Sequence, residues 1–128
     1  MKPLLEVSDI CLSYHSISGE TRVLSHISFS LFPGEFLAVV GPSGCGKSTL
    51  LNLICGLLKP EQGQILLNGE PVFAGDCRIG YMLQKDHLLE WRKIYKNVIL
   101  GLEIRKELTA EKLAYVNQML LTYGLDKF

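Results

Sequence analysis

The stretch GPSGCGKSTL, residues 41 to 50, brings three glycines, a lysine and two kinds of hydroxyl side chain to one turn of the chain. The preceding residues 36 to 40, FLAVV, are continuously apolar, which predicts a strand covered on both faces in a parallel sheet. From Lys47 onward the apolar spacing predicts a helix, with Gly56 as its stop. A glycine-rich turn between a buried strand and a helix favours a phosphate-binding loop.

The spacing of residues 41 to 48 matches G-x-x-x-x-G-K-[ST]. Glycines at these positions can adopt backbone angles closed to other residues, so successive N–H groups can point inward around an anion. The helix that follows turns its positive end toward the same place. We expect Lys47 to reach the β- and γ-phosphates as a point charge and Ser48 to offer its hydroxyl to Mg²⁺.

The composition is that of a globular domain and excludes several other classes of protein. Of the 128 residues, 48% are hydrophobic and 20% are charged. Thirteen acidic residues balance thirteen basic ones, so no overall field favours nucleic acid or anionic lipid. The N-terminal residues do not resemble a signal peptide, and no run of apolar residues is long enough to span a membrane.

The cysteines and histidines suggest no site of their own. Cys11, Cys45, Cys55 and Cys77 show no C-x-x-C spacing, which disfavours a zinc site and favours reduced thiols in a cytosolic protein. His15, His26 and His87 have no nucleophile or acidic partner at a telling spacing, so we assign them no role.

The remaining elements are predicted from alternation, helical spacing and turn residues. Residues 4 to 14 and 23 to 32 read as strands, separated by a polar loop at 15 to 22 and followed by a Pro33-Gly34 turn. Asn68-Gly69 predicts a hairpin, and residues 78 to 84 read as another strand. Helices are expected near 93 to 105 and near 110 to 123, the second with Thr109 as N-cap and Gly124 past its end.

Residues 41 to 72, GPSGCGKSTLLNLICGLLKPEQGQILLNGEPV, resemble the ATP-binding cassette family, the ATPase subunits of ABC transporters. Tyr14 matches the aromatic residue that stacks on adenine in that family. Gln84, in YMLQKDHLLEW, matches the Q-loop glutamine, which senses Mg²⁺ and the attacking water and couples to the transmembrane subunit. The stretch after it is similar to the nitrate, sulfonate and taurine importer branch.

The resemblance implies an α/β fold, a P-loop NTPase core with an N-terminal antiparallel β subdomain. Residues 1–40 would hold the β region and the P-loop strand, 41–56 the P-loop and its helix, 57–84 the β segment to the Q-loop, and 85–128 the start of a helical subdomain. Lys47 and Gln84 would be catalytic, and Ser48 and Gln84 would hold the metal. The expected residues for ATP are Tyr14, Gly41, Pro42, Ser43, Gly44, Cys45, Gly46, Lys47, Ser48 and Thr49.

The sequence departs from the family pattern in its second half. A Walker B strand ends in Asp-Glu, and no Asp-Glu pair occurs here. The LSGGQ-type signature and the switch histidine are also missing, so we expect the chain to end before them. In the family, the Walker B and switch strands lie between the strands that correspond to 36–40 and 78–84. Without these neighbours both strands would have open edges, so we expect a marginally stable, aggregation-prone chain.

Three functions remain open at this point. The first is the ATPase subunit of an ABC-type importer, in which water attacks the γ-phosphate of Mg-ATP. The second is a fragment that binds nucleotide without hydrolysing it, and the third is a different P-loop enzyme such as a small kinase. The resemblance implies permease subunits and a second ATP-binding subunit as partners, no nucleic acid, and a cytoplasmic location at the inner face of the membrane.

Several of these residues also have ordinary structural explanations. Tyr14 could be a strand-end tyrosine, and Gln84 could be an inert surface side chain. Phe32 and Trp91 are expected to pack rather than to contact a ligand. The basic segments WRKIYK and IRKEL are expected to be solvated helix faces, because neighbouring glutamates neutralise them.

Overall fold

The computed structural model describes residues 2–17, 19–74, 76, 78–85 and 87–127. The chain forms two compact units, Met1–Tyr81 and Met82–Phe128. Among the described residues, none of the helices combines the length and the hydropathy that crossing a membrane requires.

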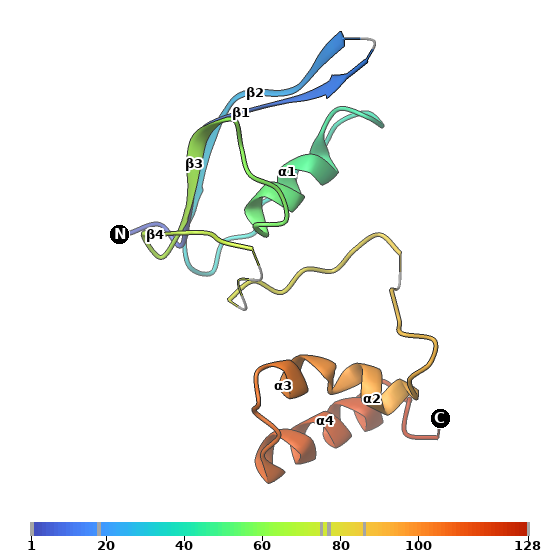
Figure 1. The fold of residues 1–128 in the computed structure, drawn as a ribbon. Coiled ribbons are helices and arrows are strands. Elements are labelled where there is room, and N and C mark those ends of the chain that lie inside the picture. The colour runs from blue at the N-terminus through green and yellow to red at the C-terminus, as the bar shows by residue number, and fades with distance from the viewer. Residues whose placement is uncertain (1, 18, 75, 77, 86, 128) are drawn as a thin grey trace. The chain divides into compact units, whose positions relative to one another are not determined.

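The first unit is built on a four-stranded antiparallel sheet in the order β2-β1-β3-β4 (Figure 1). Its strands are β1 (Leu5–Ser16), β2 (Gly19–Leu31), β3 (Gln62–Leu67) and β4 (Glu70–Pro71). The helix α1 (Lys47–Ile54) covers one face of this sheet. Leu50 and Leu53 of α1 share a buried core with residues of the first three strands, which are Leu5, Val7, Ile10, Leu12, Leu24, Ile65 and Leu67. Alternating apolar residues in β1 and the apolar face of α1 therefore meet as the sequence pattern predicts.

The first hairpin is longer than predicted. Residues 15 to 22 were expected to form a polar loop, but β1 continues to Ser16 and β2 already begins at Gly19. Tyr14 pairs with Thr21 and His15 with Glu20 in the ladder. Polar side chains do not prevent strand pairing when both faces of a hairpin end are exposed, and the polar composition alone gave the wrong prediction here.

The predicted turns are confirmed. Asn68 and Gly69 both have positive φ, 55° and 82°, as a two-residue type I′ hairpin between β3 and β4 requires. Gly34 has a φ of 82° after Pro33, and the Glu35 N–H donates to Phe32 O over 3.1 Å. Gly56, with a φ of 71°, follows the C-cap of α1 as expected.

Two predicted strands are not formed. Residues 35 to 40 and 78 to 83 belong to no helix or strand, and Phe36 and Val40 are 93% and 88% exposed. The prediction of strands at 36–40 and 78–84 was therefore wrong for this chain. Apolar composition suits a buried parallel strand, but such a strand forms only between neighbours that satisfy its backbone groups. The sheet of the described residues provides no such neighbours.

An ion-pair cluster stabilises the segment after β4. The Arg78 guanidinium donates from Nε to Asp76 Oδ1 over 2.8 Å and from a terminal nitrogen to Glu70 Oε2 over 2.7 Å. The Asp76 side chain is fully buried. Hydrogen bonds from Arg78 hold the pKa of Asp76 below its usual value, although burial acts in the opposite direction.

The described residues of the second unit form α2 (Ile94–Val98), α3 (Leu100–Ile104) and α4 (Ala110–Thr122). The single helix predicted at 93 to 105 is interrupted at Ile99, whose ψ of −1° breaks the helical hydrogen-bond ladder. The second predicted helix is confirmed: Thr109 is the N-cap of α4, and Gly124 follows it with a φ of 68°. Trp91 was expected to pack but is 81% exposed.

Candidate functional site: the glycine-rich loop

The loop before α1 is shaped by two glycines in the left-handed region. Gly44 has a φ of 81° and Gly46 a φ of 99°, and Gly46 is the N-cap of α1 without a side-chain cap. A Cβ at Gly46 would lie 3.0 Å from a methyl carbon of Leu24 and 3.1 Å from the carbonyl oxygen of Val23. Only glycine combines this backbone angle with this close approach, so β2 fixes the base of the loop.

The loop and the first turn of α1 present free amide donors. Among the described residues, no protein acceptor takes a hydrogen bond from the N–H groups of Gly44, Gly46, Lys47 or Ser48. The Cys45 N–H donates to Pro42 O over 3.4 Å. The first turn carries no acidic residue that would oppose an anion. Free amides at a helix N-terminus make a binding site for phosphate oxygens, so the residues present fit a nucleotide.

The Lys47 ammonium lies at the mouth of this loop. Lys47 Nζ donates to Gly41 O over 2.8 Å and to Pro42 O over 2.6 Å, and lies 3.5 Å from Cys45 Sγ. The cation therefore closes the loop on itself through two carbonyl oxygens. These carbonyls are weaker partners for an ammonium than a charged phosphate oxygen, so the same side chain can serve an anion held by the loop.

Ser48 and Thr49 occupy the second and third positions of α1. Ser48 is exposed and Thr49 is half-buried. Pro42 and Ser43 are exposed on the loop. The structure thus brings the predicted residues from Gly41 to Thr49 together in one loop and helix turn, as their contiguity in the sequence requires.

Tyr14 lies on the hairpin against which the loop packs. Tyr14 is 49% exposed and pairs with Thr21 in the ladder. The bulge at Val23 and the residue Leu24 follow Thr21 closely along β2. Because Gly46 contacts Val23 and Leu24, Tyr14 belongs to the same unit and the same hairpin end as the loop. Its role in adenine stacking remains a prediction.

Gln84 lies in the second unit, outside any helix or strand, and its side chain is exposed. In the part of the chain that the structure describes, it makes no hydrogen bond to another residue. The loop belongs to the first unit, and the roles of Gln84 toward Mg²⁺ and water remain predictions.

Two histidines have acidic partners that the sequence did not indicate. His15 Nε2 lies 3.0 Å from Glu61 Oε1, and His26 Nδ1 lies 2.7 Å from Asp9 Oδ1. The sequence analysis found no acidic partner at a telling spacing, and the fold supplies one for each of these two histidines. Each pair joins residues that are far apart in the sequence and adjacent in the folded sheet, so spacing along the chain carries no signal of them.

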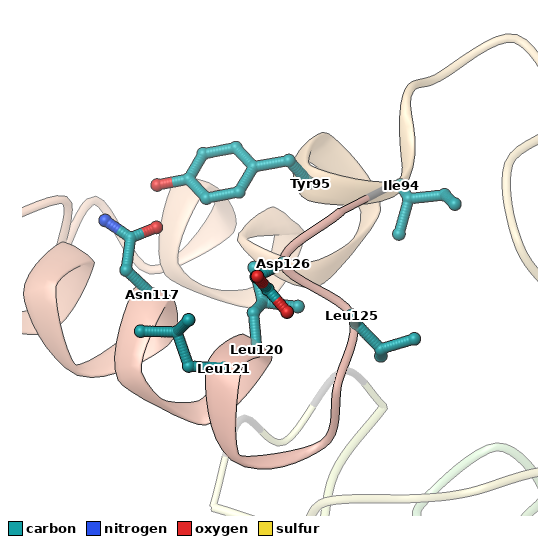
Figure 2. A pocket seen from close by; sticks show the side chains of 7 residues that line it. All are labelled: Ile94, Tyr95, Asn117, Leu120, Leu121, Leu125 and Asp126. Carbon is teal, nitrogen blue, oxygen red and sulfur yellow. The ribbon is translucent and has the colours of Figure 1, made fainter.

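The second unit contains a hollow of about 220 Å³ between α2, α4 and the C-terminal residues. Figure 2 shows the leucine side chains of α4, Leu120 and Leu121, beside Leu125 and Asp126 of the segment that follows. Ile94, Tyr95 and Asn117 complete the lining. Lysine and arginine are absent from the described residues that line this hollow, and Asp126 would repel an anion, so these residues do not suit a nucleotide phosphate.

The comparisons with known proteins agree on one protein family for this chain. The family model described as ABC transporter matches residues 24–128. The taurine import ATP-binding protein TauB of Pseudomonas putida is 42% identical over 125 residues, which is 98% of this chain and 47% of that protein. The chain spans about half the length of the curated relatives it matches.

Solved structures agree with the sequence comparison. The ATP-binding cassette MJ0796, solved as a dimer in a post-hydrolysis state with ADP and Pi, superposes with a TM-score of 0.74 at 26% identity. That match covers 85% of this chain and 52% of that one. The structure of cbiO1 from Clostridium perfringens, part of the ABC transporter complex cbiONQ, gives a TM-score of 0.74 at 26% identity, with 99% of this chain and 53% of that one covered.

Proposed function

Because the chain belongs to the ABC transporter family, we propose that it binds ATP through the loop at 41–49 and forms the Walker A part of an importer ATPase. The observation that carries this proposal is the set of amides of Gly44, Gly46, Lys47 and Ser48, which have no acceptor among the described residues, beside the Lys47 ammonium. This arrangement supports the binding of a chain of phosphates, whose negative charges need several donors at once.

Each residue of the loop would then have a role in ATP binding that follows from its chemistry. The amides of Gly44, Gly46 and Lys47 would hold phosphate oxygens, and the Lys47 side chain would exchange its two carbonyl acceptors for the β- and γ-phosphates. Ser48 is the exposed hydroxyl nearest the start of α1, which supports it as a ligand of Mg²⁺. Mg²⁺ held there would neutralise part of the negative charge of the phosphates.

Tyr14 would contact the adenine ring. It lies half exposed at the hairpin end that packs on Gly46, which supports a base stacked on its ring while the phosphates enter the loop. Gln84 would act on Mg²⁺ and the attacking water, as the family resemblance implies.

A second candidate function is nucleotide binding without turnover. The sequence contains no Asp-Glu pair that could supply the Mg²⁺-linked aspartate and the catalytic glutamate of the family. Hydrolysis needs a residue that positions or activates water, and loop amides alone only hold the phosphates. For this 128-residue chain we favour nucleotide binding without turnover. For a whole importer ATPase we propose ATP hydrolysis coupled to the import of a small anion or organic solute.

The partners would follow from that role. TauB is named as an import protein, MJ0796 was solved as a dimer and cbiO1 is part of a transporter complex. These names support permease subunits and a second ATP-binding subunit as partners of the whole protein. Contact with the permease would hold it at the inner face of the membrane.

The proposal is tested by titrating the purified chain with ATP and Mg²⁺ in a calorimeter. We expect Lys47→Ala to abolish binding, because the ammonium lies within the loop, where it donates to the carbonyl oxygens of Gly41 and Pro42. Lys59→Ala, an exposed lysine after α1 in the same unit, is the matched control and should bind like wild type. Equal binding by wild type and Lys47→Ala would contradict the proposal.

Two further measurements separate the functions and test the adenine contact. Phosphate release should be absent in the 128-residue chain, and turnover that disappears in Lys47→Ala would favour the ATPase over binding alone. Tyr14→Ala should weaken ATP binding by about 1–3 kcal/mol, the range of base–aromatic stacking. Unchanged affinity in Tyr14→Ala would remove Tyr14 from the site.

A further inference from the structure

Three side chains with metal-binding atoms meet on the first sheet, away from the proposed nucleotide site. Asp9 and Cys11 come from β1 and His26 comes from β2. A carboxylate oxygen, a thiol sulfur and a ring nitrogen of these residues all lie within 4.8 Å of one another. The proposed function uses none of the three.

Irregularities in both strands place these side chains together. The register of β1 and β2 shifts between Val7 and Ile10 and again between Ile10 and Leu12. Asp9 and His26 both have left-handed backbone, with φ of 53° and 51°. Such angles are uncommon for non-glycine residues, and here one occurs in each of the two paired strands. The two bulges bring the His26 ring onto the Asp9 carboxylate.

Neighbouring groups orient the three ligands. The Asp9 N–H donates to Ser28 Oγ over 2.8 Å, and Gln62 Nε2 donates to Asp9 Oδ2 over 3.3 Å. The His26 N–H donates to Cys11 Sγ over 3.3 Å. Hydrogen bonds of this kind hold metal ligands in place in known sites.

The cluster lies on the face of the sheet opposite to α1. Ile10 and Leu12 are 0% and 8% exposed because they point into the core that α1 shares. Asp9 and Cys11 alternate with them along β1, so their side chains point to the other face. The exposure of Asp9 and His26 gives a cation access from solvent, independently of the glycine-rich loop.

We propose that Asp9, Cys11 and His26 bind one Zn²⁺ ion. A set of one sulfur, one nitrogen and one oxygen ligand suits Zn²⁺, whereas Ca²⁺ and Mg²⁺ require several oxygen ligands. Three protein ligands leave the fourth tetrahedral position to water. The ion takes the place of the proton between His26 Nδ1 and Asp9 Oδ1, which are 2.7 Å apart, and the Cys11 thiol releases its proton to solvent.

The test is a titration of the full 128-residue chain with Co²⁺ as a spectroscopic probe, followed by displacement with Zn²⁺. We expect one equivalent of Co²⁺ to give a thiolate-to-cobalt charge-transfer band that Zn²⁺ removes. Cys11→Ser and His26→Gln should each weaken binding by about 100-fold or more, since loss of a ligand exceeds the effect of losing a supporting hydrogen bond. Asp9→Asn should weaken it as well.

The chain offers matched controls for each ligand. His15→Gln removes a histidine that pairs with Glu61 at 3.0 Å and is not one of the three proposed ligands, and Cys55→Ser removes a half-buried thiol at the end of α1. Both should retain the band. A melting curve of each variant, with and without Zn²⁺, distinguishes lost binding from lost folding, since only proteins with the site should be stabilised by the ion.

Two outcomes would overturn the proposal. The first is a charge-transfer band that persists in Cys11→Ser. The second is a wild-type chain without the band, in which His26→Gln lowers the melting temperature equally with and without Zn²⁺. In that second case the Asp9–His26 pair only stabilises the two bulges.

Discussion

The Lys47 ammonium has hydrogen-bond partners within the loop itself, and the proposed function would give it phosphate oxygens as partners instead. In the structure it donates to the carbonyl oxygens of Gly41 and Pro42, which lie at the start of the loop. The ammonium that would pair with a bound phosphate therefore holds the two ends of the loop together in this structure. Under the proposed function, binding of nucleotide would exchange these hydrogen bonds for others rather than leave the ammonium without a partner.

Asp76 is the residue whose ionisation should matter most for the stability of the first unit. Its buried carboxylate accepts two hydrogen bonds from the Arg78 side chain, and these lower its pKa from the usual 3.8. A carboxyl group with a lowered pKa in the folded state stabilises the fold fully above its unfolded pKa. That contribution is lost as the pH falls through the lower folded pKa.

We therefore predict that acid destabilises the wild-type first unit more than it destabilises Asp76→Asn. The variant should be less stable than wild type near neutral pH, because Arg78 loses its buried partner. The difference should shrink as the pH falls below the usual aspartate value of 3.8 and through the lower pKa of Asp76 in the folded state. Urea midpoints measured at several pH values check this, with Glu70→Gln, which removes the exposed partner of Arg78, as the control. A pH-independent difference between Asp76→Asn and wild type would contradict it.

At the scale of elements, α4 illustrates a helix whose ends are set by two residues. The Thr109 side chain accepts a hydrogen bond from the Lys112 N–H over 3.3 Å, and Gly124 ends the helix in the left-handed region. Leu113, Val116 and Leu120 are half-buried, whereas Tyr115 and Leu121 are exposed. The caps therefore define the helix more sharply than its modest apolar face does.

Thr109→Ala should destabilise the second unit by about 1 kcal/mol, the usual effect of losing an N-cap side chain. Thr122→Ala is the matched control at the other end of α4. Its hydroxyl donates to Gln118 O over 2.9 Å, a bond that adds little to a helix, so this variant should remain close to wild type. Circular dichroism during thermal unfolding measures both. Equal effects of the two substitutions would show that the cap hydrogen bond does not stabilise α4.

At the scale of the whole molecule, the chain carries apolar segments that its own sheet does not cover. Phe36, Val40 and Met82 are 93%, 88% and 93% exposed. They lie in the segments 36–40 and 78–84, which have the composition of buried strands and no strand structure here. Exposed apolar segments with unpaired backbone groups are sites of association, so the fold of this chain by itself is open to further pairing.

We predict that the purified chain self-associates through the segment 36–40. The average mass from sedimentation velocity should rise with concentration, and the double variant Phe36→Ser/Val40→Ser should stay monomeric to higher concentration. Ile17→Ser is the control, because Ile17 is fully exposed but isolated among polar residues at the hairpin tip. A wild-type chain that is monomeric at every concentration and unfolds in one cooperative transition would exclude this behaviour.

The sequence by itself determined the features that depend on neighbouring residues. The glycine spacing at 41–48 predicted the loop and the start of α1, Asn68-Gly69 predicted the hairpin, and Thr109 with Gly124 predicted the ends of α4. Each of these is a property of backbone angles and hydrogen bonds within a few residues, so a local pattern is sufficient to specify it.

The tertiary structure alone decided which residues distant in the chain meet. Strand formation at 36–40 and 78–84 depends on a partner strand, and apolar composition predicts burial without saying whether that partner exists. Asp9, Cys11 and His26 meet because two bulges shift the register of β1 against β2, and His15 meets Glu61 from 46 residues away. Contacts of this kind are set by pairing and register across the sheet, which no spacing along the sequence encodes.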